Sequence, residues 1–479
     1  MKKQSSSKVT GLLLGPILFS VLQFVPFTLI SDRGDIVISI ALWMIIWWIT
    51  EAVSISVTAL LPLVLFPLFD IMTLNDVSSN YGSPIVFLFF GGFILALALE
   101  KVQLHKRIAL TIIKKTGTTP NKVILGFMIA TAFISMWISN TASTVVMLPI
   151  ALSVINLLIN DKDGFTKKDK NFALSMMLGI AFSANAGGIA TIIGTPPNSV
   201  LIGFLESQYE IRISFLKWMT IGLPVAIVLI TLVYFVLVKW VFPSKGLVFD
   251  ASVSVIDDEY KKLGKASPKE KQVLYIFMII IILWIFRSFI NSIFPQIAIS
   301  DTVISMMGAI ALFTIPFNLK KGDFILEWKD TKDLSWGILI LFGGGLALAK
   351  GMSTTGIVAN ITDLIAASNI GVLLTVSLLI FIMLFMTELM SNVALIAVFA
   401  PVVAGIAIGL EVPMLHVLIP VTMASSCAFM LPMATPPNAI VFASGLVKVS
   451  QMARAGIILN LFAVILLILV FQFLLPLLF

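Results

Sequence analysis

Thr195-Pro196-Pro197-Asn198 interrupts one long apolar run of the chain, and Thr435-Pro436-Pro437-Asn438 interrupts another. Proline lacks the backbone N–H and its ring clashes with the preceding turn, so a helix must break at each stretch. Proline is also favoured in the first turn of a helix. Each stretch therefore predicts that one helix ends and a second begins within the same apolar run, with the threonine as its N-cap.

The apolar runs around these stretches define the class of protein. Of the 479 residues, 59% are hydrophobic and only 11% are charged, whereas a soluble domain carries about 25% charged residues. Apolar stretches recur from residue 9 to residue 479, each near the ~20 residues that a helix needs to cross the hydrocarbon. Because these runs are continuous, they exclude the alternating strands of a membrane barrel. The sequence predicts an all-α polytopic membrane protein.

The basic residues predict the orientation of the chain. Let the chain start in the cytoplasm and cross once per apolar span, with 123–159 and 369–409 each entering and leaving on one side. This path places 26 of the 31 Lys and Arg residues inside, as the positive-inside rule demands. It explains the net charge of +7 without nucleic acid, and it predicts a cytoplasmic N-terminus and an external C-terminus. Arg33, Arg212, Lys217 and Lys350 are left outside, and Arg287 lies within a span.

The two halves of the sequence repeat each other. Ser139-Asn140 and Ser391-Asn392 are 252 residues apart, and the two Thr-Pro-Pro-Asn stretches are 240 apart. On the predicted path the two hairpins open to opposite faces, so the halves are related by inversion, with about eleven transmembrane helices plus two re-entrant hairpins. Inverted repeats with interrupted helices indicate a secondary transporter with its site at the midplane. The predicted organisation is an N-terminal span 1–35, a first repeat 36–243 (hairpin 123–159, broken helix 172–204), a cytoplasmic linker 244–271, and a second repeat 272–479 (hairpin 369–409, broken helix 413–446).

The repeated polar segments predict a binding site. The two hairpin tips and the two breaks supply four helix N-termini, whose free N–H groups and partial positive charge suit anions. The segments hold no carboxylate, while Asn and Thr add neutral donors, so an organic anion with two ends is the expected substrate. The breaks also free the carbonyls of Gly194 and Ala434 for a cation. The structural alternative is that these segments only make turns and kinks.

Two other classes of membrane protein fit the sequence less well. An intramembrane enzyme would need a serine with a histidine partner, an aspartate pair or a zinc motif, and the His-Glu-x-x-His pattern is absent. The single cysteine, Cys427, cannot form an intramolecular disulfide or a cysteine metal cluster. A channel would not need hairpins that open to opposite faces.

The repeated segments resemble those of the divalent anion:sodium symporter family. The resemblance rests on Ser139-Asn140-Thr141-Ala142 at a hairpin tip, on Gly194-Thr195-Pro196-Pro197-Asn198 in a broken helix, and on the doubling of both. Trp47-Trp48-Ile49-Thr50-Glu51-Ala52, followed by Thr58-Ala59-Leu60-Leu61-Pro62, is also similar to that family. The resemblance spans nearly the whole chain. The family includes di- and tricarboxylate symporters and dicarboxylate exchangers.

The resemblance implies a homodimer in the cell membrane, in which a transport domain slides past a fixed scaffold in an elevator motion. The implied substrates are C4 or C5 dicarboxylates of the succinate, malate, fumarate and 2-oxoglutarate type, with no cofactor other than sodium as a coupling ion. The implied substrate-binding residues are Ser139, Asn140, Thr141, Thr195, Pro196, Asn392, Val393, Thr435 and Pro436. The implied sodium sites are Ser135, Ser139, Asn140 and Gly194, and Thr387, Met390, Asn392 and Ala434.

Val393 departs from the family pattern, because a threonine usually follows the second Ser-Asn in the symporters. The missing hydroxyl beside one expected sodium site favours a sodium-independent dicarboxylate exchanger. The alternative is a sodium-coupled di- or tricarboxylate symporter, since the ligand types at Thr387, Asn392 and Ala434 are retained.

Glu388 is a further candidate, because it lies three residues before Ser391 and therefore near the second tip. A carboxylate inside a membrane is a functional candidate by default, for instance in proton coupling. The interpretation we favour is a hydrogen-bonded brace.

Overall fold

The computed structural model describes residues 2–24, 31–117, 119–159, 165–244, 252–296, 299–318, 322–368 and 370–479. Parts of the expected N-terminal span 1–35, of the charged loop 160–171 and of the linker 244–271 lie outside these residues. All of the predicted site residues lie within them.

The described chain is mostly helical, with one small antiparallel hairpin of strands β1 (Pro316–Asn318) and β2 (Asp323–Phe324). The first half contains α1 (Lys2–Leu22), α2 (Asp32–Thr50), α3 (Ile55–Thr58), α4 (Leu61–Leu68), α5 (Leu74–Tyr81), α6 (Pro84–Lys101), α7 (Leu104–Thr116), α8 (Pro120–Ser135), α9 (Asn140–Ile159), α10 (Lys167–Gly188), α11 (Pro196–Tyr209), α12 (Phe215–Tyr234) and η1 (Phe235–Val241). The second half contains α13 (Ser252–Lys262), α14 (Pro268–Ile293), α15 (Asp301–Thr314), η2 (Trp328–Asp333), α16 (Trp336–Thr354), α17 (Ile357–Ala366), α18 (Val372–Met386), α19 (Asn392–Gly409), α20 (Met414–Ser425), α21 (Pro436–Ala443), α22 (Val449–Leu469), η3 (Val470–Leu474) and α23 (Leu475–Leu478).

Within the described residues, seven helical segments are long and apolar enough to cross a membrane, and further apolar helices of 10–17 residues lie between them. This agrees with a helical polytopic membrane protein, while the number of crossings stays a prediction. The seven segments are Asp32–Thr50, Leu74–Lys101, Phe215–Val241, Pro268–Ile293, Trp336–Thr354, Asn392–Gly409 and Val449–Leu478.

The apolar run of residues 53–69 is long enough for one span but forms two short helices. Helix α3 ends at Thr58, and α4 begins at Leu61 with Pro62 in its first turn. Pro62 has no N–H for the carbonyl four residues earlier, which is that of Thr58, so one continuous helix is disfavoured here.

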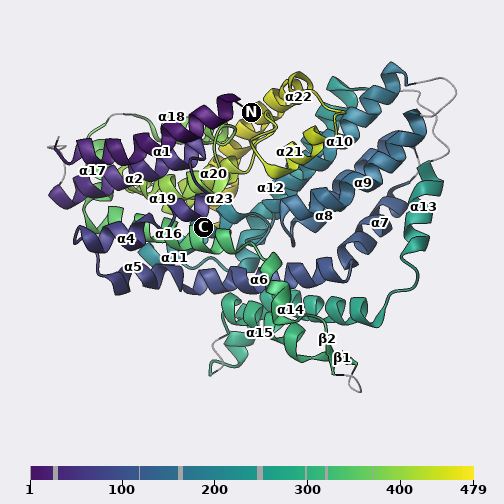
Figure 1. Ribbon diagram of the computed structural model, residues 1–479, viewed down its shortest axis with the longest axis horizontal. Helices are drawn as coiled ribbons and strands as arrows, with labels where there is room; N and C mark the ends of the chain where they lie inside the picture. The colour runs from purple at the N-terminus through teal and green to yellow at the C-terminus, as the bar shows by residue number, and fades with distance from the viewer. Residues whose placement is uncertain are drawn as a thin grey trace.

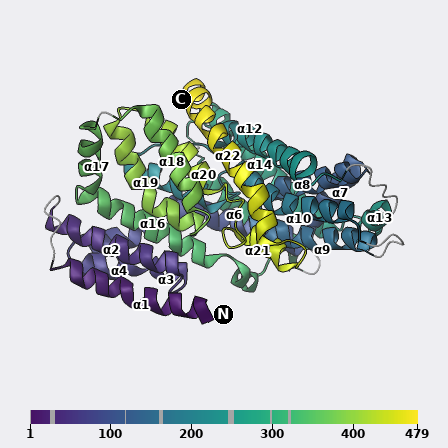
Figure 2. The ribbon, with the colours of Figure 1, turned by 90° about the horizontal axis from the view of Figure 1, so that it is seen from above.

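The helices form two groups joined by a central layer (Figures 1 and 2). Helices α7 to α10 and α13 lie at one end of the molecule, and α1, α2, α4 and α16 to α19 lie at the other. Helices α12, α20, α21 and α22 lie between them. Each group contains one helical hairpin, α8–α9 in the first and α18–α19 in the second.

Each broken helix connects the two groups. Helix α10 packs on α8 and α9, and its continuation α11 packs on α16 and α19 of the other group. In the same way, α20 packs on α18 and α19, while its continuation α21 packs on α9 and α10. Each hairpin is therefore in contact with helices from both broken helices.

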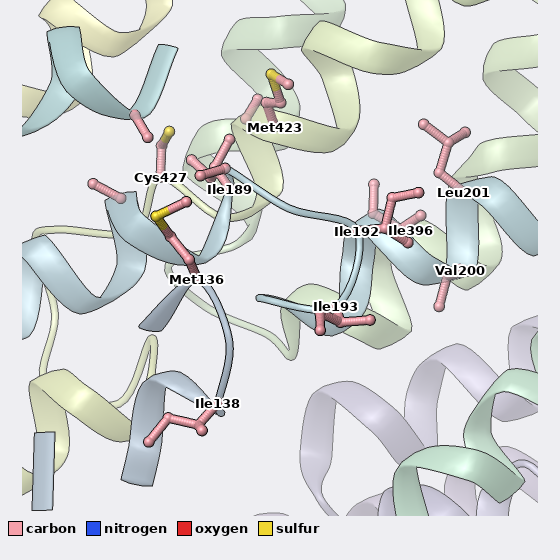
Figure 3. Packing of buried hydrophobic residues seen from close by; sticks show 14 of the residues in the cluster. Met136, Ile138, Ile189, Ile192, Ile193, Val200, Leu201, Ile396, Met423 and Cys427 are labelled. Atoms are coloured by element: carbon pink, nitrogen blue, oxygen red, sulfur yellow. The ribbon is translucent and has the colours of Figure 1, made fainter. Parts of the chain in front are cut away.

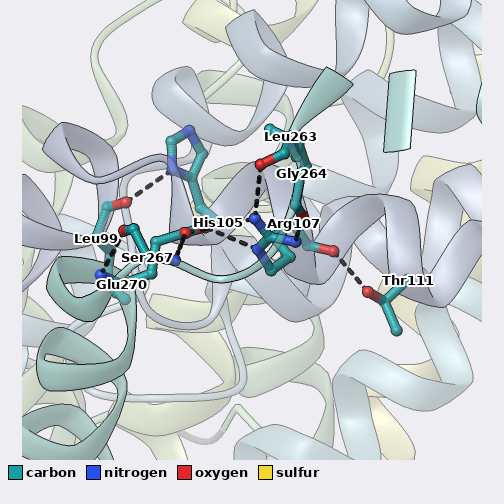
Figure 4. Close-up of polar contacts among 8 residues, drawn as sticks. All are labelled: Leu99, His105, Arg107, Thr111, Leu263, Gly264, Ser267 and Glu270. Carbon is teal, nitrogen blue, oxygen red and sulfur yellow. Dashed lines mark hydrogen bonds and ion pairs between the residues drawn. The ribbon is translucent and has the colours of Figure 1, made fainter. Parts of the chain in front are cut away.

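A polar cluster holds the end of the linker between the halves against α7 (Figure 4). Arg107 donates to Glu270 at 2.7 Å and to the carbonyls of Leu263 and Gly264 at 3.1 and 3.0 Å. Nearby, His105 Nδ1 lies 3.0 Å from the Leu99 carbonyl, and burial lowers the pKa of this imidazole. These contacts fix the end of the linker, because releasing it would leave the half-buried guanidinium and the buried Glu270 carboxylate without their partners.

Candidate functional site

The first tip is the turn between α8, which ends at Ser135, and α9, which begins at Asn140. Ser139 Oγ accepts a hydrogen bond from the Ala142 N–H at 3.1 Å. The serine therefore caps the returning helix and satisfies one of its free N–H groups. Ser139 is exposed, while Asn140 and Thr141 are half-buried.

Oxygen atoms converge on the side chain of Asn140. Ser135 Oγ lies 2.6 Å from the Asn140 amide and donates to the Ala184 carbonyl at 2.8 Å. With its NH₂ group turned toward these oxygens, the Asn140 amide donates to Ser135 Oγ and to the carbonyls of Ala184 and Gly194, both at 3.2 Å. A Cβ on Gly188 would lie 2.5 Å from the Asn140 side chain, so this close approach requires glycine. The structure thus brings Ser135, Asn140 and Gly194 together.

The second tip repeats this arrangement with a threonine. Thr387 Oγ1 lies 2.6 Å from Asn392 Oδ1 and 2.5 Å from the Ser425 carbonyl. A hydroxyl has one hydrogen, so it can serve only one of these two acceptors. The three oxygens are therefore short of one positive partner. Ser391 occupies the N-cap position of α19, but its hydroxyl does not cap the helix.

The asparagine that ends each Thr-Pro-Pro-Asn stretch holds the broken helix together. Asn198 Nδ2 donates to the carbonyls of Thr191 at 2.8 Å and Gly188 at 3.3 Å. Asn438 Nδ2 donates to the carbonyls of Leu431 and Ala428, both at 3.1 Å. The acceptors lie seven and ten residues before the asparagine in both halves. These two asparagines are braces that the sequence analysis did not assign, although their place in the repeated stretch was a signal for them.

The two threonines of these stretches differ. Both occupy the N-cap position with extended backbone, but only Thr435 accepts the N–H of the asparagine three residues later, Asn438, at 3.4 Å. For Thr195, the prediction of a side-chain cap is wrong. The Thr435 hydroxyl oxygen also accepts a hydrogen bond from the Asn185 amide at 3.1 Å. Both threonines are buried.

Glu388 is buried beside the second break. Its carboxylate accepts the N–H groups of Phe429, Met430 and Leu431 at 2.8, 2.9 and 3.0 Å. It also accepts the Asn460 amide at 2.8 Å. Four donors satisfy the carboxylate, which is the arrangement a brace requires, since a buried charge is tolerated only with such compensation.

The remaining predicted residues are placed without such contacts. Among the described residues, no side-chain hydrogen bond is formed by Thr141. Thr141, Val393 and Pro196 are half-buried and Pro436 is exposed, whereas Met390 and Ala434 are buried. Of the four residues expected at the second sodium site, Thr387 and Asn392 are therefore the pair joined by a side-chain hydrogen bond. The carbonyl of Ser425, which was not expected there, also contacts Thr387.

Apolar side chains pack around the first tip and the first break (Figure 3). Met136 of the tip lies near Ile189 and Cys427, whereas Ile138 lies apart from them, and Ile192 and Ile193 lie at the break. Such packing lowers the local dielectric, so uncompensated oxygens attract a cation more strongly than they would in water. The labelled residues are nearly or fully buried.

A cavity of about 410 Å³ reaches the first tip at Ala142. It follows one face of α9 as far as Ser153 and is bounded on the other side by Glu100, Lys106 and Glu259. Lys106 and Glu259 form an ion pair of 2.9 Å. The cavity thus connects the tip with the charged residues around α7 and α13.

Comparison with known proteins relates nearly the whole chain to one family. Residues 6–479 match the model of the sodium:sulfate symporter transmembrane region. The sodium-dependent dicarboxylate transporter SdcS of Staphylococcus saprophyticus is 41% identical over 482 aligned residues, which cover 99% of this chain and 93% of that protein. SdcS of Staphylococcus aureus strain USA300 is 40% identical, with coverages of 99% and 92%.

Two solved structures share the fold at low identity. MtrF of Neisseria gonorrhoeae, from a class of antimetabolite efflux pumps, has a TM-score of 0.54 at 15% identity and covers 84% of this chain and 83% of its own. The YdaH transporter of Alcanivorax borkumensis has a TM-score of 0.53 at 10% identity, with coverages of 82% and 86%. At these identities the likeness concerns the fold alone.

Proposed function

The chain belongs to the family of the sodium:sulfate symporter transmembrane region, and from this premise we propose that it is a sodium-coupled symporter of C4 or C5 dicarboxylates. The family is the one that its paired tip and break motifs resemble, and it consists of transporters rather than enzymes. The SdcS relatives carry the name of sodium-dependent dicarboxylate transporters and align over nearly the full chain.

The oxygen atoms that gather at the two tip asparagines support sodium coupling, and those at the second tip lack one positive partner. At the second tip, a single hydroxyl hydrogen faces Asn392 Oδ1 and the Ser425 carbonyl. At the first, the carbonyls of Ala184 and Gly194 face the Asn140 amide. Hydroxyl, amide and carbonyl oxygens are the ligand types of hard cations. A sodium ion at the first tip would turn the Asn140 amide so that its oxygen faces the ion.

Anion binding in this proposal rests on the helices that begin at the tips and breaks. Helices α9, α11, α19 and α21 start at Asn140, Pro196, Asn392 and Pro436. Their N-termini carry free N–H groups and partial positive charge. The predicted substrate-binding side chains there are at least partly exposed, apart from those of Thr195 and Thr435. The two carboxylates of the substrate would each meet one tip.

The symporter is better supported than the sodium-independent exchanger that Val393 favoured. The argument for the exchanger was one missing hydroxyl at Val393, yet the oxygen cluster at the second tip is formed by Thr387, Asn392 and Ser425 without that position. The relatives named for sodium dependence support the same choice. Two negative charges on the substrate are then balanced by co-bound cations, and the empty carrier can return.

The proposal includes the arrangement in the membrane. The protein would be a homodimer in the cell membrane, with its N-terminus in the cytoplasm and its C-terminus outside. The two hairpins and the two broken helices would form the transport domain, which moves past the rest in an elevator motion. The positive-inside asymmetry supports this orientation. With Cys427 replaced, single cysteines in the linker should react with an impermeant thiol reagent from the cytoplasmic side only.

Uptake into vesicles tests the proposed function directly. Reconstituted protein should take up radiolabelled succinate into empty vesicles under an inward sodium gradient, and replacement of sodium by choline should abolish uptake. Vesicles preloaded with succinate and kept free of sodium are the control for exchange. Sodium-free uptake into the loaded vesicles, without uptake into empty ones, would show an exchanger instead.

A further inference from the structure

Asn185 of α10 reaches from the first half of the molecule into the second break. Its side chain is 1% exposed. Its NH₂ group donates to Thr435 Oγ1 at 3.1 Å and to the Ala428 carbonyl at 3.2 Å, and it lies 3.4 Å from Asn438 Oδ1. These three partners are the cap, the unwound backbone and the brace of the second broken helix.

The residue before Asn185 belongs to the first tip. The Ala184 carbonyl accepts the Ser135 hydroxyl at 2.8 Å and faces the Asn140 amide at 3.2 Å. Of these two consecutive residues of one helix, Ala184 therefore contacts the first proposed sodium site, and Asn185 contacts Thr435, the neighbour of Ala434 in the second. A shift of the Ala184 carbonyl toward a bound ion would displace the Asn185 amide with it, because both are fixed to the same turn of α10.

At the far end, Thr435 directly follows Ala434, one of the carbonyls proposed for the second sodium site. The Thr435 hydroxyl caps α21 through the Asn438 N–H at 3.4 Å. A change in the hydrogen bond from Asn185 therefore alters how the Thr435 backbone is held. It would alter the position of the Ala434 carbonyl in the same step.

Among the residues that the structure describes, the second half forms no matching link at the corresponding position. Ser425, which is 240 residues after Asn185, directs its hydroxyl to the Thr422 carbonyl of its own helix at 2.7 Å. The next residue, Ser426, is buried, and its hydroxyl has no partner among the described residues. The contact between the halves at this level thus depends on the side chain of Asn185.

We infer that Asn185 couples the two tips, so that sodium bound at one tip raises the affinity for sodium at the other. This inference rests on the proposed function, because it needs sodium to bind at both tips. Asn185 is a positioning residue in this scheme, since it holds Thr435, the residue next to the proposed ligand Ala434, and does not itself contact an ion. The coupling is reciprocal, as linkage between two binding equilibria requires.

The test is a sodium titration of the purified full-length protein, read as thermal stabilisation at constant ionic strength with choline as the replacement. Linkage makes the unfolding temperature report sodium binding. The unaltered protein should titrate with a Hill coefficient above one. Asn185→Leu should lower the coefficient to about one and raise the half-saturating sodium concentration about fivefold or more. Ser183→Ala, which alters another buried polar side chain of α10, should keep the parental coefficient.

Asn185→Ser guards against a folding defect of the leucine variant, because its shorter side chain cannot reach Thr435 but leaves a small polar group in place. Asn185→Ser should also lose cooperativity in sodium binding. Adding Ser135→Ala to this variant should then cause no further change in the Hill coefficient. Parental cooperativity in both Asn185 variants would overturn the inference, as would a coefficient of one in the unaltered protein. No sodium response at all would overturn the proposed function, and the inference with it.

Discussion

The two breaks carry the same four residues, Thr-Pro-Pro-Asn, yet their surroundings stabilise them differently. In the first, Thr191 Oγ1 donates to the Met136 carbonyl at 2.6 Å. In the second, the Leu431 N–H donates to the Glu388 carboxylate at 3.0 Å. Leu431 is 240 residues after Thr191, and Glu388 is 252 after Met136, so corresponding positions are in contact in both halves. In the first half a side chain donates to a backbone carbonyl, whereas in the second a backbone N–H donates to a side chain.

This comparison separates what is local from what is not. The braces from Asn198 and Asn438 span the same seven and ten residues in both halves, since they lie within the repeated stretch. The contact between break and tip depends on residues that the repeat does not preserve. The second half has a charged brace and the first a neutral one, so the halves should differ in how they tolerate substitution.

The largest effect is expected at the tip asparagines. Asn140→Ala and Asn392→Ala should each nearly abolish sodium-driven succinate uptake, because each removes the amide at the centre of an oxygen cluster. A hydrogen bond to a charged group contributes roughly 1.5–3 kcal/mol, or about tenfold or more in affinity. Uptake at subsaturating succinate measures the loss, with purified yield as the control for folding. Near-normal uptake by one variant would show that its tip is only a turn.

A smaller but unequal effect is expected at the contacts that distinguish the breaks. Glu388→Gln places an amide where four donors converge, whereas Thr191→Val removes one neutral hydroxyl. Bonds to charged groups contribute about 1.5–3 kcal/mol and neutral ones about 0.5–1.5 kcal/mol, so Glu388→Gln should lower the unfolding temperature in detergent more. Glu411→Gln, at an exposed position, is the control. An equal loss for both break variants would contradict the comparison.

The smallest effect is expected at the position after each tip asparagine. Thr141 keeps a hydroxyl and Val393 has none, so Thr141→Val should raise the KM for succinate severalfold, and Val393→Ala should change it less. The reason is that only Thr141 can offer a neutral donor to a substrate carboxylate. Concentration dependence of uptake measures both values. Small and equal changes would indicate that neither position faces the substrate.

Some contacts of the candidate site could be expected from the sequence, and others could not. The contact of Ser135 with Asn140 and the pairing of Thr387 with Asn392 join residues that the family resemblance had grouped, while their role in binding stays a prediction. The carbonyls of Ala184 and Ser425 were missed, because a backbone oxygen carries no signal in the residue type. Asn185 was missed for a different reason. Its partners lie about 250 residues away, and no repeat or spacing connects it with them.

The sequence by itself determined that this is a helical membrane protein with two broken helices. Both conclusions follow from properties that act within a few residues, namely the hydropathy of a span and the missing N–H of proline. Only the tertiary structure decided which break receives the Glu388 carboxylate, which threonine caps its helix and where Asn185 binds. Those outcomes depend on donors and acceptors brought together from distant parts of the chain, because buried polar groups must find partners wherever the packing offers them.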